Sequence, residues 1–183
     1  MEFRSNSFQG DLFSDRQPKV SHPKPDPIDT LARAKRELEF KLDEGAICPC
    51  CGKYARRYRR KFNSSMARSL IWLYRVSTTD GTDAASWVDV PNTAPKWLLR
   101  TNQLPTVRWW GFIERRPADN DQKHSGYWRP TKAGIGFVLR TIRARSAVVT
   151  YNGEPVGFEG DSILIDSALG RNFSYRELMG FQP

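Results

Sequence analysis

The amino-acid sequence predicts an α+β fold of short helices and short strands, and three local patterns support this prediction. Phe112–Arg116 and Tyr127–Thr131 are rich in aromatic and β-branched residues, which is typical of strands, and a polar loop separates them. Thr131 is a good N-cap for the apolar run Ile135–Ile142, which has helical spacing. Asn152-Gly153 lies between two apolar segments and is the strongest short-range hairpin signal in the chain.

Length and composition fit one core-bearing domain with appendages. The chain has 183 residues, of which 39% are hydrophobic and six are tryptophan. No apolar run approaches the roughly 18 residues that a membrane-spanning helix needs, and no signal-peptide pattern opens the sequence. The three cysteines all lie within residues 48–51, so they do not form a secreted disulfide framework. We therefore expect a cytoplasmic protein with no membrane partner.

The net charge of +9 is concentrated in the middle of the chain. Residues 45–146 hold nineteen Lys and Arg against six Asp and Glu. Residues 1–44 hold eight against nine, and residues 147–183 hold two against five. A basic segment this confined predicts a polyanionic partner. The alternative is a solvated surface that only keeps the protein soluble.

Two segments precede the central domain. Residues 1–27 are predicted to form a disordered arm, because they are mixed in charge, lack a period and carry four prolines within residues 18–27. Residues 28–62 begin with a helix that Asp29 caps and that runs to about Glu44. Its apolar stripe consists of Leu31, Ala34, Leu38 and Leu42. We expect this helix to pack within the chain; pairing with a second copy, which would give a homodimer, is the alternative.

A Cys-Pro-x-Cys-Gly turn runs from Cys48 to Gly52 and resembles one knuckle of a zinc ribbon. The two-residue spacing lets the thiolates of Cys48 and Cys51 face one tetrahedral ion. A complete ribbon needs a second pair, and the chain has no further cysteines. His124 is the one downstream histidine, so a zinc site of Cys48, Cys51, His124 and a fourth ligand is one interpretation. A half-knuckle that has lost its metal is the other.

A basic run follows the knuckle, in a stretch without any acidic residue between Glu44 and Asp80. Tyrosine interleaves with basic residues in this run, whose candidate members are Lys53, Arg56, Arg57, Tyr58, Arg59, Arg60 and Lys61. Arginine forks bind phosphates, and tyrosines donate hydrogen bonds to backbone oxygens or stack on bases. We expect nucleic-acid contact here. The alternatives are a solvated run, or arginines that neutralise carboxylates of the N-terminal helix.

Residues 63–146 are predicted to form one domain. In chain order we expect a helix from Ser64 or Ser65 to Val76, a strand at Trp87–Val90, a helix capped by Asn92 or Thr93, a short third helix from Pro105 to before Gly111, the two strands named above, and a helix over Thr131–Arg145. The paired tryptophans that end the third helix, Trp109 and Trp110, are expected to fill the core.

This order resembles a winged helix-turn-helix domain, over roughly residues 64–145. The shared motifs are Trp-Gly-Phe-Ile-Glu after the third helix and the Gly-x-Trp-Arg-x-Thr-x-x-Gly pattern that ends at Gly134. The resemblance implies that the third helix and its turn present Asn102, Gln103, Thr106 and Arg108 to a major groove. It also implies a wing whose basic residues, Arg115, Arg116, Lys123 and Arg129, lie along phosphates or in a minor groove. Whether Arg108 contacts bases or only phosphate stays open.

Residues 147–183 extend beyond this pattern. We expect a hairpin of strands Ala147–Tyr151 and Pro155–Phe158, a third strand at Asp161–Ile165, and a short helix that starts with the capping box Ser174–Glu177. This acidic extension either covers the core or binds a partner protein.

The order of knuckle, basic run, winged helix and hairpin also resembles small uncharacterised bacteriophage proteins. The chain has no glycine-rich phosphate loop, paired carboxylates or His-Glu-x-x-His motif, and only two histidines, so we do not expect an enzyme. The sequence therefore favours a protein that binds nucleic acid, double-stranded DNA in particular, in transcription regulation or phage DNA transactions in a bacterial host. An adaptor or inhibitor that binds a host protein through the basic surface is the competing hypothesis.

Overall fold

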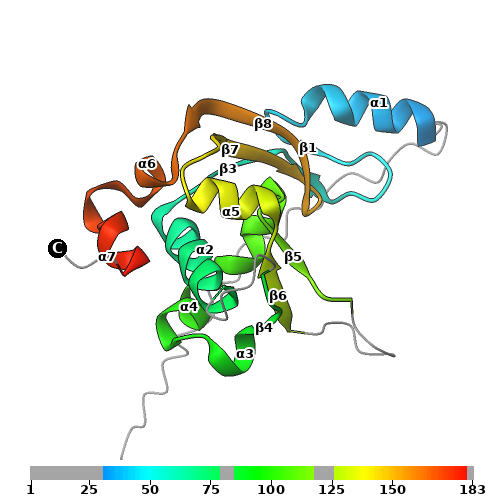
Figure 1. Cartoon of the computed structure of the whole chain (residues 1–183). Coiled ribbons are helices and arrows are strands. Elements are labelled where there is room, and N and C mark those ends of the chain that lie inside the picture. Colours follow the sequence, from blue (N-terminus) through cyan, green and yellow to red (C-terminus); the bar gives the residue numbers. More distant parts are fainter. Residues whose placement is uncertain (1–30, 79–84, 118–125, 181–183) are drawn as a thin grey trace, which may run out of the picture. The chain divides into compact units, whose positions relative to one another are not determined.

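The chain has a mixed α+β fold, and every strand pair in its described part is antiparallel, which confirms the predicted fold class. The computed structural model describes residues 31–78, 85–117 and 126–180. The chain divides into two compact units, residues 1–55 and 56–183, which are described separately below (Figure 1).

The first unit consists of one helix and a small hairpin. Helix α1 (Leu31–Lys41) buries Ala34 and Leu38, and Leu42 is buried just after it, so most of the predicted stripe is internal. Leu31 does not share this environment, because 58% of it is exposed. Strand β1 (Ala46–Ile47) pairs with β2 (Tyr54–Ala55), and the cysteine turn closes the hairpin. The predicted apolar face is therefore real but one turn shorter than expected.

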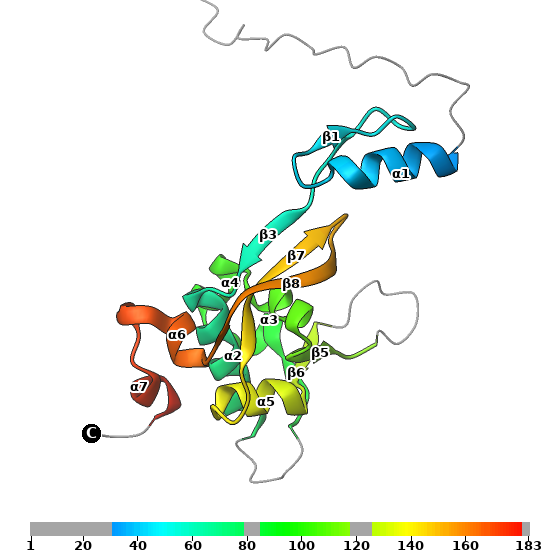
Figure 2. The ribbon, with the colours of Figure 1, turned by 90° about the horizontal axis from the view of Figure 1, so that it is seen from above.

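Helix α2 (Ser64–Ser77) is the central element of the second unit. Asn63 caps it through its side-chain oxygen, which accepts from the backbone N–H of Met66 at 3.0 Å, rather than Ser64 or Ser65 as predicted. Buried residues occur around most of the helix and include Leu70 and Leu73. Figures 1 and 2 show α6 and α7 on one side of α2 and β5 and β6 on the other, and α2 contacts all of these except β5 at several points.

A three-stranded sheet follows α2 along the chain. The elements in order are β4 (Val88–Asp89), α3 (Val90–Thr93), α4 (Lys96–Thr101), the 3₁₀ helix η1 (Leu104–Trp110), β5 (Ile113–Arg115), β6 (Tyr127–Pro130) and α5 (Lys132–Val138). The strand order is β4-β6-β5, so the strand that returns from the loop lies in the middle. The two strands predicted on either side of the polar loop are confirmed, each slightly shorter than expected.

The second sheet has the strand order β3-β7-β8. The sequence predicted its hairpin but not its third strand, β3. Strand β3 (Tyr58–Lys61) is the basic run itself, and it pairs with β7 (Ala144–Tyr151). Strands β7 and β8 (Glu154–Ile163) form the predicted hairpin, and Asn152 and Gly153 at its turn have φ of 51° and 82°. Two consecutive positive φ values are typical of a two-residue type I′ turn, which explains the Asn-Gly pair.

The C-terminal segment closes the core with α6 (Ile165–Leu169), the 3₁₀ turn η2 (Gly170–Asn172) and α7 (Tyr175–Met179). Ile165, Leu169 and Tyr175 are buried, and the Tyr175 hydroxyl donates to the backbone oxygen of Val138 in α5 at 2.8 Å. Ser174 caps α7, as predicted, by accepting from the backbone N–H of Glu177 at 3.4 Å. This segment therefore belongs to the core of the second unit.

An aromatic cluster joins the two sheets. Phe62 follows β3 directly, and its ring centroid lies 4.9 Å from that of Trp110, 5.3 Å from Phe137 and 6.0 Å from Phe112. Phe112 and Phe137 stack at 4.6 Å. All four side chains are buried, and the edge-to-face arrangement around Phe62 is the geometry that aromatic rings prefer. The basic strand is thus anchored by the residue that follows it.

The start of α5 is tied closely to the end of η1. The Thr131 hydroxyl accepts from the backbone N–H of Gly134 at 3.1 Å, which confirms the predicted cap, and donates to the backbone oxygen of Gly111 at 2.6 Å. The Thr131 N–H donates to the Phe112 oxygen at 2.9 Å. A Cβ atom on Gly134 would lie 2.0 Å from that same oxygen. Only glycine fits at this crossing without movement of the backbone.

Three predicted elements differ from the structure. The helix predicted over Thr131–Arg145 ends at Val138, because the N–H and hydroxyl of Thr141 both donate to the Gly136 oxygen and turn the chain back toward β7. The third strand predicted at Asp161–Ile165 is wrong: residues 161–163 continue β8 opposite β7, and Ile165 begins α6.

The second predicted helix is split in two. Asp89 accepts from the backbone N–H of Asn92 and caps the short α3, so Asn92 and Thr93 lie inside a helix rather than at its cap. Pro95 then precedes α4 without any side-chain cap. The sequence pattern missed the earlier start because Asp89 lies in the residues predicted as strand.

We predict that Gly134→Ala destabilises the protein by about 1–3 kcal/mol, although alanine favours helices by nearly 1 kcal/mol over glycine. The added methyl group would overlap the Phe112 carbonyl, which is backbone and cannot rotate away. Denaturant unfolding of the full chain, followed by tryptophan fluorescence, measures the change.

Gly136→Ala is the matched control in the same helix. Its Cβ would meet only side-chain atoms, the nearest being Thr141 Oγ1 at 3.0 Å, and side chains can adjust. A Gly134→Ala protein as stable as the Gly136→Ala protein would show that the close approach at Phe112 imposes no constraint.

Candidate nucleic-acid interface

The 3₁₀ helix η1 exposes one of its residues, Arg108, to solvent. Leu104, Val107 and Trp110 are buried at a spacing of three, which matches the three residues per turn of a 3₁₀ helix. Arg108 is the exposed member of η1, and the remaining three residues, Pro105, Thr106 and Trp109, are half-buried. The Trp110 indole N–H donates to the backbone oxygen of Arg145 at 2.8 Å and fixes the helix against β7. The prediction that Trp109 and Trp110 fill the core is confirmed for Trp110, whereas Trp109 is only half-buried and packs against the core.

Two of the other predicted reading residues, Gln103 and Thr106, are engaged locally. The Thr106 hydroxyl donates to the Gln103 oxygen at 2.5 Å, and the Gln103 side-chain amide donates to the Thr101 oxygen at 3.2 Å. Asn102 ends α4 in the left-handed conformation with φ of 47°, and it lines a cavity beside β6. Asn102 and Arg108 are therefore the exposed members of this group, and Arg108 has the longer side chain with which to reach a partner.

Strand β3 presents its basic residues at an edge of the second sheet. Tyr58, Arg59, Arg60 and Lys61 are all exposed, and β7 pairs with β3 on one side only. The Arg60 guanidinium lies 5.5 Å from the ring centroid of Trp109 in η1, within the range of a cation–π contact. This contact places Arg60 next to the residue that follows Arg108. The structure thus brings two separately predicted groups, the basic run and the third helix, together.

Part of the basic run is neutralised. Arg59 Nε donates to Glu159 of β8 at 3.2 Å, with both side chains about half exposed. Arg56 is exposed and Arg57 is half-buried before β3 begins. Lys53 belongs to the first unit, where it is exposed in the cysteine turn. The charge that this stretch offers to a polyanion is thus smaller than the residue count suggests.

The arginines of the predicted wing are also partly occupied. Arg129 forms an ion pair with Glu114 across the β5–β6 ladder, at 2.5 Å, and lies 4.3 Å from the ring centroid of Trp87. Arg115 packs its guanidinium over Trp128 at 5.1 Å, and Arg116 is exposed with its guanidinium 5.7 Å from the Tyr127 ring. Lys123 lies outside the described residues. Arg116 is the wing arginine that the structure leaves most accessible.

The cysteine turn has the backbone geometry of a tight loop. The Cys48 N–H donates to the Lys53 oxygen, and the Gly52 N–H donates to the Cys48 oxygen, both at 2.8 Å. The backbone N–H of Cys51, and next that of Cys50, donate to the Cys48 sulfur and lower the pKa of this thiol. Partial desolvation, followed by the nearby charge of Cys48, raises the pKa of Cys50. At a given pH, a larger fraction of Cys48 than of Cys50 is therefore ionised to the thiolate.

The described residues supply two of the three predicted zinc ligands. Cys48 is half-buried and Cys51 is exposed, and neither forms a disulfide. No three His, Cys, Asp or Glu side chains gather as a metal site within residues 31–78, 85–117 and 126–180. His124, the third predicted ligand, and His22 lie outside these ranges. The zinc site stays a prediction.

Sequence reasoning missed the acidic partners Glu114 and Glu159 and the role of Trp109 as a support for Arg60. Glu114 was open to prediction, because a hairpin of two short strands brings it opposite Arg129. The contacts of Glu159 and Trp109 depend on pairing between β3 and β7, which lie far apart in the sequence. No local signal marks such a contact.

We predict that Cys48 is alkylated by iodoacetamide with a pH midpoint lower than that of Cys50, because the pKa of Cys48 is lowered and that of Cys50 is raised. Peptide mass spectrometry across pH 6–10, with a chelator present, measures each site separately. Equal midpoints would mean that the backbone N–H groups do not stabilise the Cys48 thiolate.

Comparison with known proteins gives no assignment: no family model, curated protein or solved structure matches the chain. Within its described part, no helix combines the length and the apolar character needed to cross a membrane. The functional conclusion therefore depends on the geometry of the second unit.

Proposed function

We propose that the second unit is a winged-helix domain that binds double-stranded DNA through η1 and β3. Two structural facts support the winged-helix arrangement. The elements α2, β4, α3, α4, η1, β5 and β6 follow one another in the order helix, strand, two short helices, 3₁₀ helix, strand, strand. The strand order β4-β6-β5 places the first strand beside the returning strand of the hairpin.

The exposure of Arg108 carries the proposal. A 3₁₀ helix of seven residues offers a narrow outward face, and in η1 the exposed residue on that face is an arginine. The planar guanidinium matches the O6 and N7 acceptors of guanine in a major groove, and it also matches phosphate. Because η1 is short and exposes one long side chain, it can contact the edge of one base pair.

Strand β3 supplies the complementary contact with the DNA backbone. Arg60 and Lys61 are exposed, and Arg60 is positioned beside η1 by Trp109. Arginines and lysines outside the reading element fix the register of a protein on DNA through phosphates. Such contacts release counterions and make affinity fall steeply with salt.

We predict that Arg108→Ala weakens binding to a selected DNA sequence by about 1–3 kcal/mol and has a much smaller effect on a scrambled duplex. Arg108→Lys keeps the charge but removes the planar fork, so it should weaken the selected duplex nearly as much. The target sequence comes first from selection on a random duplex library with the unmodified chain. Fluorescence anisotropy at fixed salt then measures each variant.

Arg176→Ala is the matched control, because Arg176 is also exposed but lies on α7. Equal losses on both duplexes would leave Arg108 as a phosphate contact and remove the sequence-reading role. A chain that selects no duplex, or whose affinity does not change with salt, would reject DNA binding and favour a host-protein partner.

We propose in addition that Cys48 and Cys51 hold a zinc ion. Support comes from the pair spacing and from the backbone N–H groups that stabilise the Cys48 thiolate. Bound zinc would link the ends of the β1–β2 loop and act on the structure of the first unit.

We predict about one zinc per chain when the protein is purified without chelator, and a lower melting temperature after chelation, because the metal binds the folded state. Elemental analysis and thermal unfolding measure the two effects. Cys48→Ser and Cys51→Ser should lose the metal, whereas Cys50→Ser should retain it. Protein without metal would contradict the site, as would equal metal content in the three variants.

A further inference from the structure

A cavity of about 360 Å³ lies between α3, α4, the start of η1 and the strands β5 and β6, all within the second unit. Pro91 of α3, Leu99 of α4 and Pro105 of η1 form part of its wall, and Trp128 of β6 lines it from the sheet. Small-molecule sites in proteins generally occupy roughly 300–1,000 Å³, so this cavity is large enough for a small ligand.

Contacts within the protein hold the walls in place. The backbone N–H of Val90, which begins α3, donates to the Gly126 oxygen at 3.3 Å. A Cβ atom on Gly126 would lie 3.1 Å from Cγ of Pro91, so this proline ring already packs closely against the glycine. Pro105 has a fixed φ and lies in the first turn of η1, which Trp110 holds against β7. The cavity is therefore largely pre-formed, as ligand sites usually are.

Most of the described residues that line the cavity are apolar. Leu98, Leu104 and Trp128 are buried and line it from three different elements. Leu99 lies beside them with 47% of its surface exposed, so it keeps apolar surface in water unless a ligand covers it. An apolar cavity of about 150 Å³ lined by aliphatic and aromatic side chains is already large enough to hold benzene. These walls therefore favour the ring of a small organic molecule.

Asn102 adds an uncharged polar group to the lining. Its side chain is exposed and has no hydrogen-bond partner within residues 31–78, 85–117 and 126–180. The amide offers both a donor and an acceptor, so it can bond to a hydroxyl or a carbonyl group. Arg115 also lines the cavity, with its guanidinium 5.1 Å from the ring centroid of Trp128. A charged ligand would lose hydration against the apolar walls, which an uncharged ligand avoids.

We infer that this cavity binds a small uncharged cyclic molecule, whose ring contacts the apolar walls and whose hydroxyl or carbonyl group bonds to the Asn102 amide. The inference goes beyond the proposed DNA binding and does not depend on it, because Arg60, Lys61 and Arg108 do not line the cavity. Its test contains no DNA, so failure of one proposal leaves the other standing.

The test uses three probes on the full chain, and ¹H–¹⁵N spectra of the tryptophan indoles follow binding. 4-Methylphenol carries the ring and a hydroxyl, toluene carries the ring alone, and 4-methylbenzoate carries the ring with a negative charge. The first two should bind and shift the Trp128 resonance. 4-Methylbenzoate should bind on the order of tenfold more weakly than 4-methylphenol, because its charge loses hydration. Equal or tighter binding of 4-methylbenzoate would contradict an uncharged ligand.

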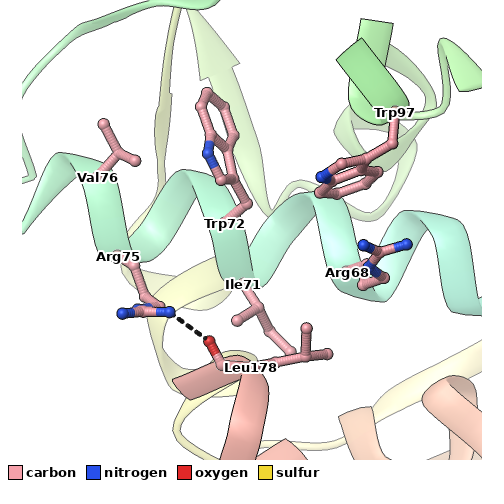
Figure 3. A pocket seen from close by; sticks show the side chains of 7 residues that line it. All are labelled: Arg68, Ile71, Trp72, Arg75, Val76, Trp97 and Leu178. Atoms are coloured by element: carbon pink, nitrogen blue, oxygen red, sulfur yellow. Dashed lines mark hydrogen bonds between the residues drawn. The ribbon is translucent and has the colours of Figure 1, made fainter. Parts of the chain in front are cut away.

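The cavity between α2, α4 and α7 provides a control for location (Figure 3). Trp72 and Trp97 line that second cavity, so their indole resonances should stay in place while that of Trp128 shifts. Shifts of Trp72 or Trp97 without a shift of Trp128 would overturn the assignment. The absence of any indole shift at the solubility limit of 4-methylphenol would also overturn it.

Asn102→Gly tests the polar contact. Asn102 has φ of 47°, and glycine adopts this left-handed conformation without strain, so the substitution removes the amide and keeps the backbone. We expect the affinity for 4-methylphenol, relative to that for toluene, to fall about fivefold, because only the phenol loses a hydrogen bond. Toluene binding in the same variant verifies that the cavity is intact. An unchanged ratio of the two affinities would reject the role of Asn102 and with it the inference.

Leu99→Ala tests the apolar contact and should weaken 4-methylphenol and toluene alike, by about threefold, because apolar contact area is lost. Leu139→Ala is the matched control, since Leu139 is 43% exposed but does not line the cavity. It should bind both probes as the unmodified chain does. Equal affinities in the two variants would show that Leu99 does not contact the ligand and would reject the proposed position.

Discussion

The close approach of Gly134 to the Phe112 carbonyl is the constraint on which the arrangement of the second unit depends. The start of α5 crosses the chain where η1 ends and β5 begins, and the absent side chain at Gly134 leaves room for that oxygen. Thr131 completes the joint, because its hydroxyl caps α5 and also donates to Gly111. One small residue and one hydroxyl thus set the position of η1, β6 and α5 relative to each other. The Thr-x-x-Gly part of the motif has a structural explanation: Thr for the cap and Gly for the crossing.

The aromatic cluster around Phe62 extends this joint to the second sheet. Phe112 and Phe137 belong to the crossing chain segments, and Phe62 inserts its ring against both directly after the basic strand. The position of β3 therefore follows from core packing rather than from the charges that it carries. Arg60 then lies over Trp109 because Trp110, its neighbour in η1, is fixed by the same cluster and by its hydrogen bond to Arg145. A polar surface is positioned here by apolar contacts beneath it, which is how a rigid scaffold supports accessible functional groups.

Much of the local structure was predictable from the sequence. The caps at Thr131 and Ser174, the turn at Asn152-Gly153 and the strands on either side of the polar loop all depend on neighbouring residues, so short patterns identify them. The pairing of β3 with β7 joins residues about ninety positions apart, and no pattern in either segment predicts which strand it pairs with. The ion pair of Arg59 with Glu159 joins residues 100 positions apart and was missed for the same reason. At the candidate site, the exposure of Arg108 follows from a period of three rather than 3.6, and a run of seven residues does not distinguish these periods.

The second sheet has edges of opposite sign. One outer strand, β3, carries the exposed Arg60 and Lys61, and the other, β8, carries the exposed Glu154 and Asp161, while Arg59 and Glu159 pair with each other. An outer strand has unpaired backbone groups that can template the addition of another strand. Between two copies, contact through the same edge is opposed by like charges, while contact of a basic edge with an acidic one is favoured. The favoured contact is head-to-tail, and repeated contacts of this kind build a ring or an open filament rather than a symmetric dimer. Because such contacts weaken as ionic strength rises, we expect association between these edges to decrease as salt is added.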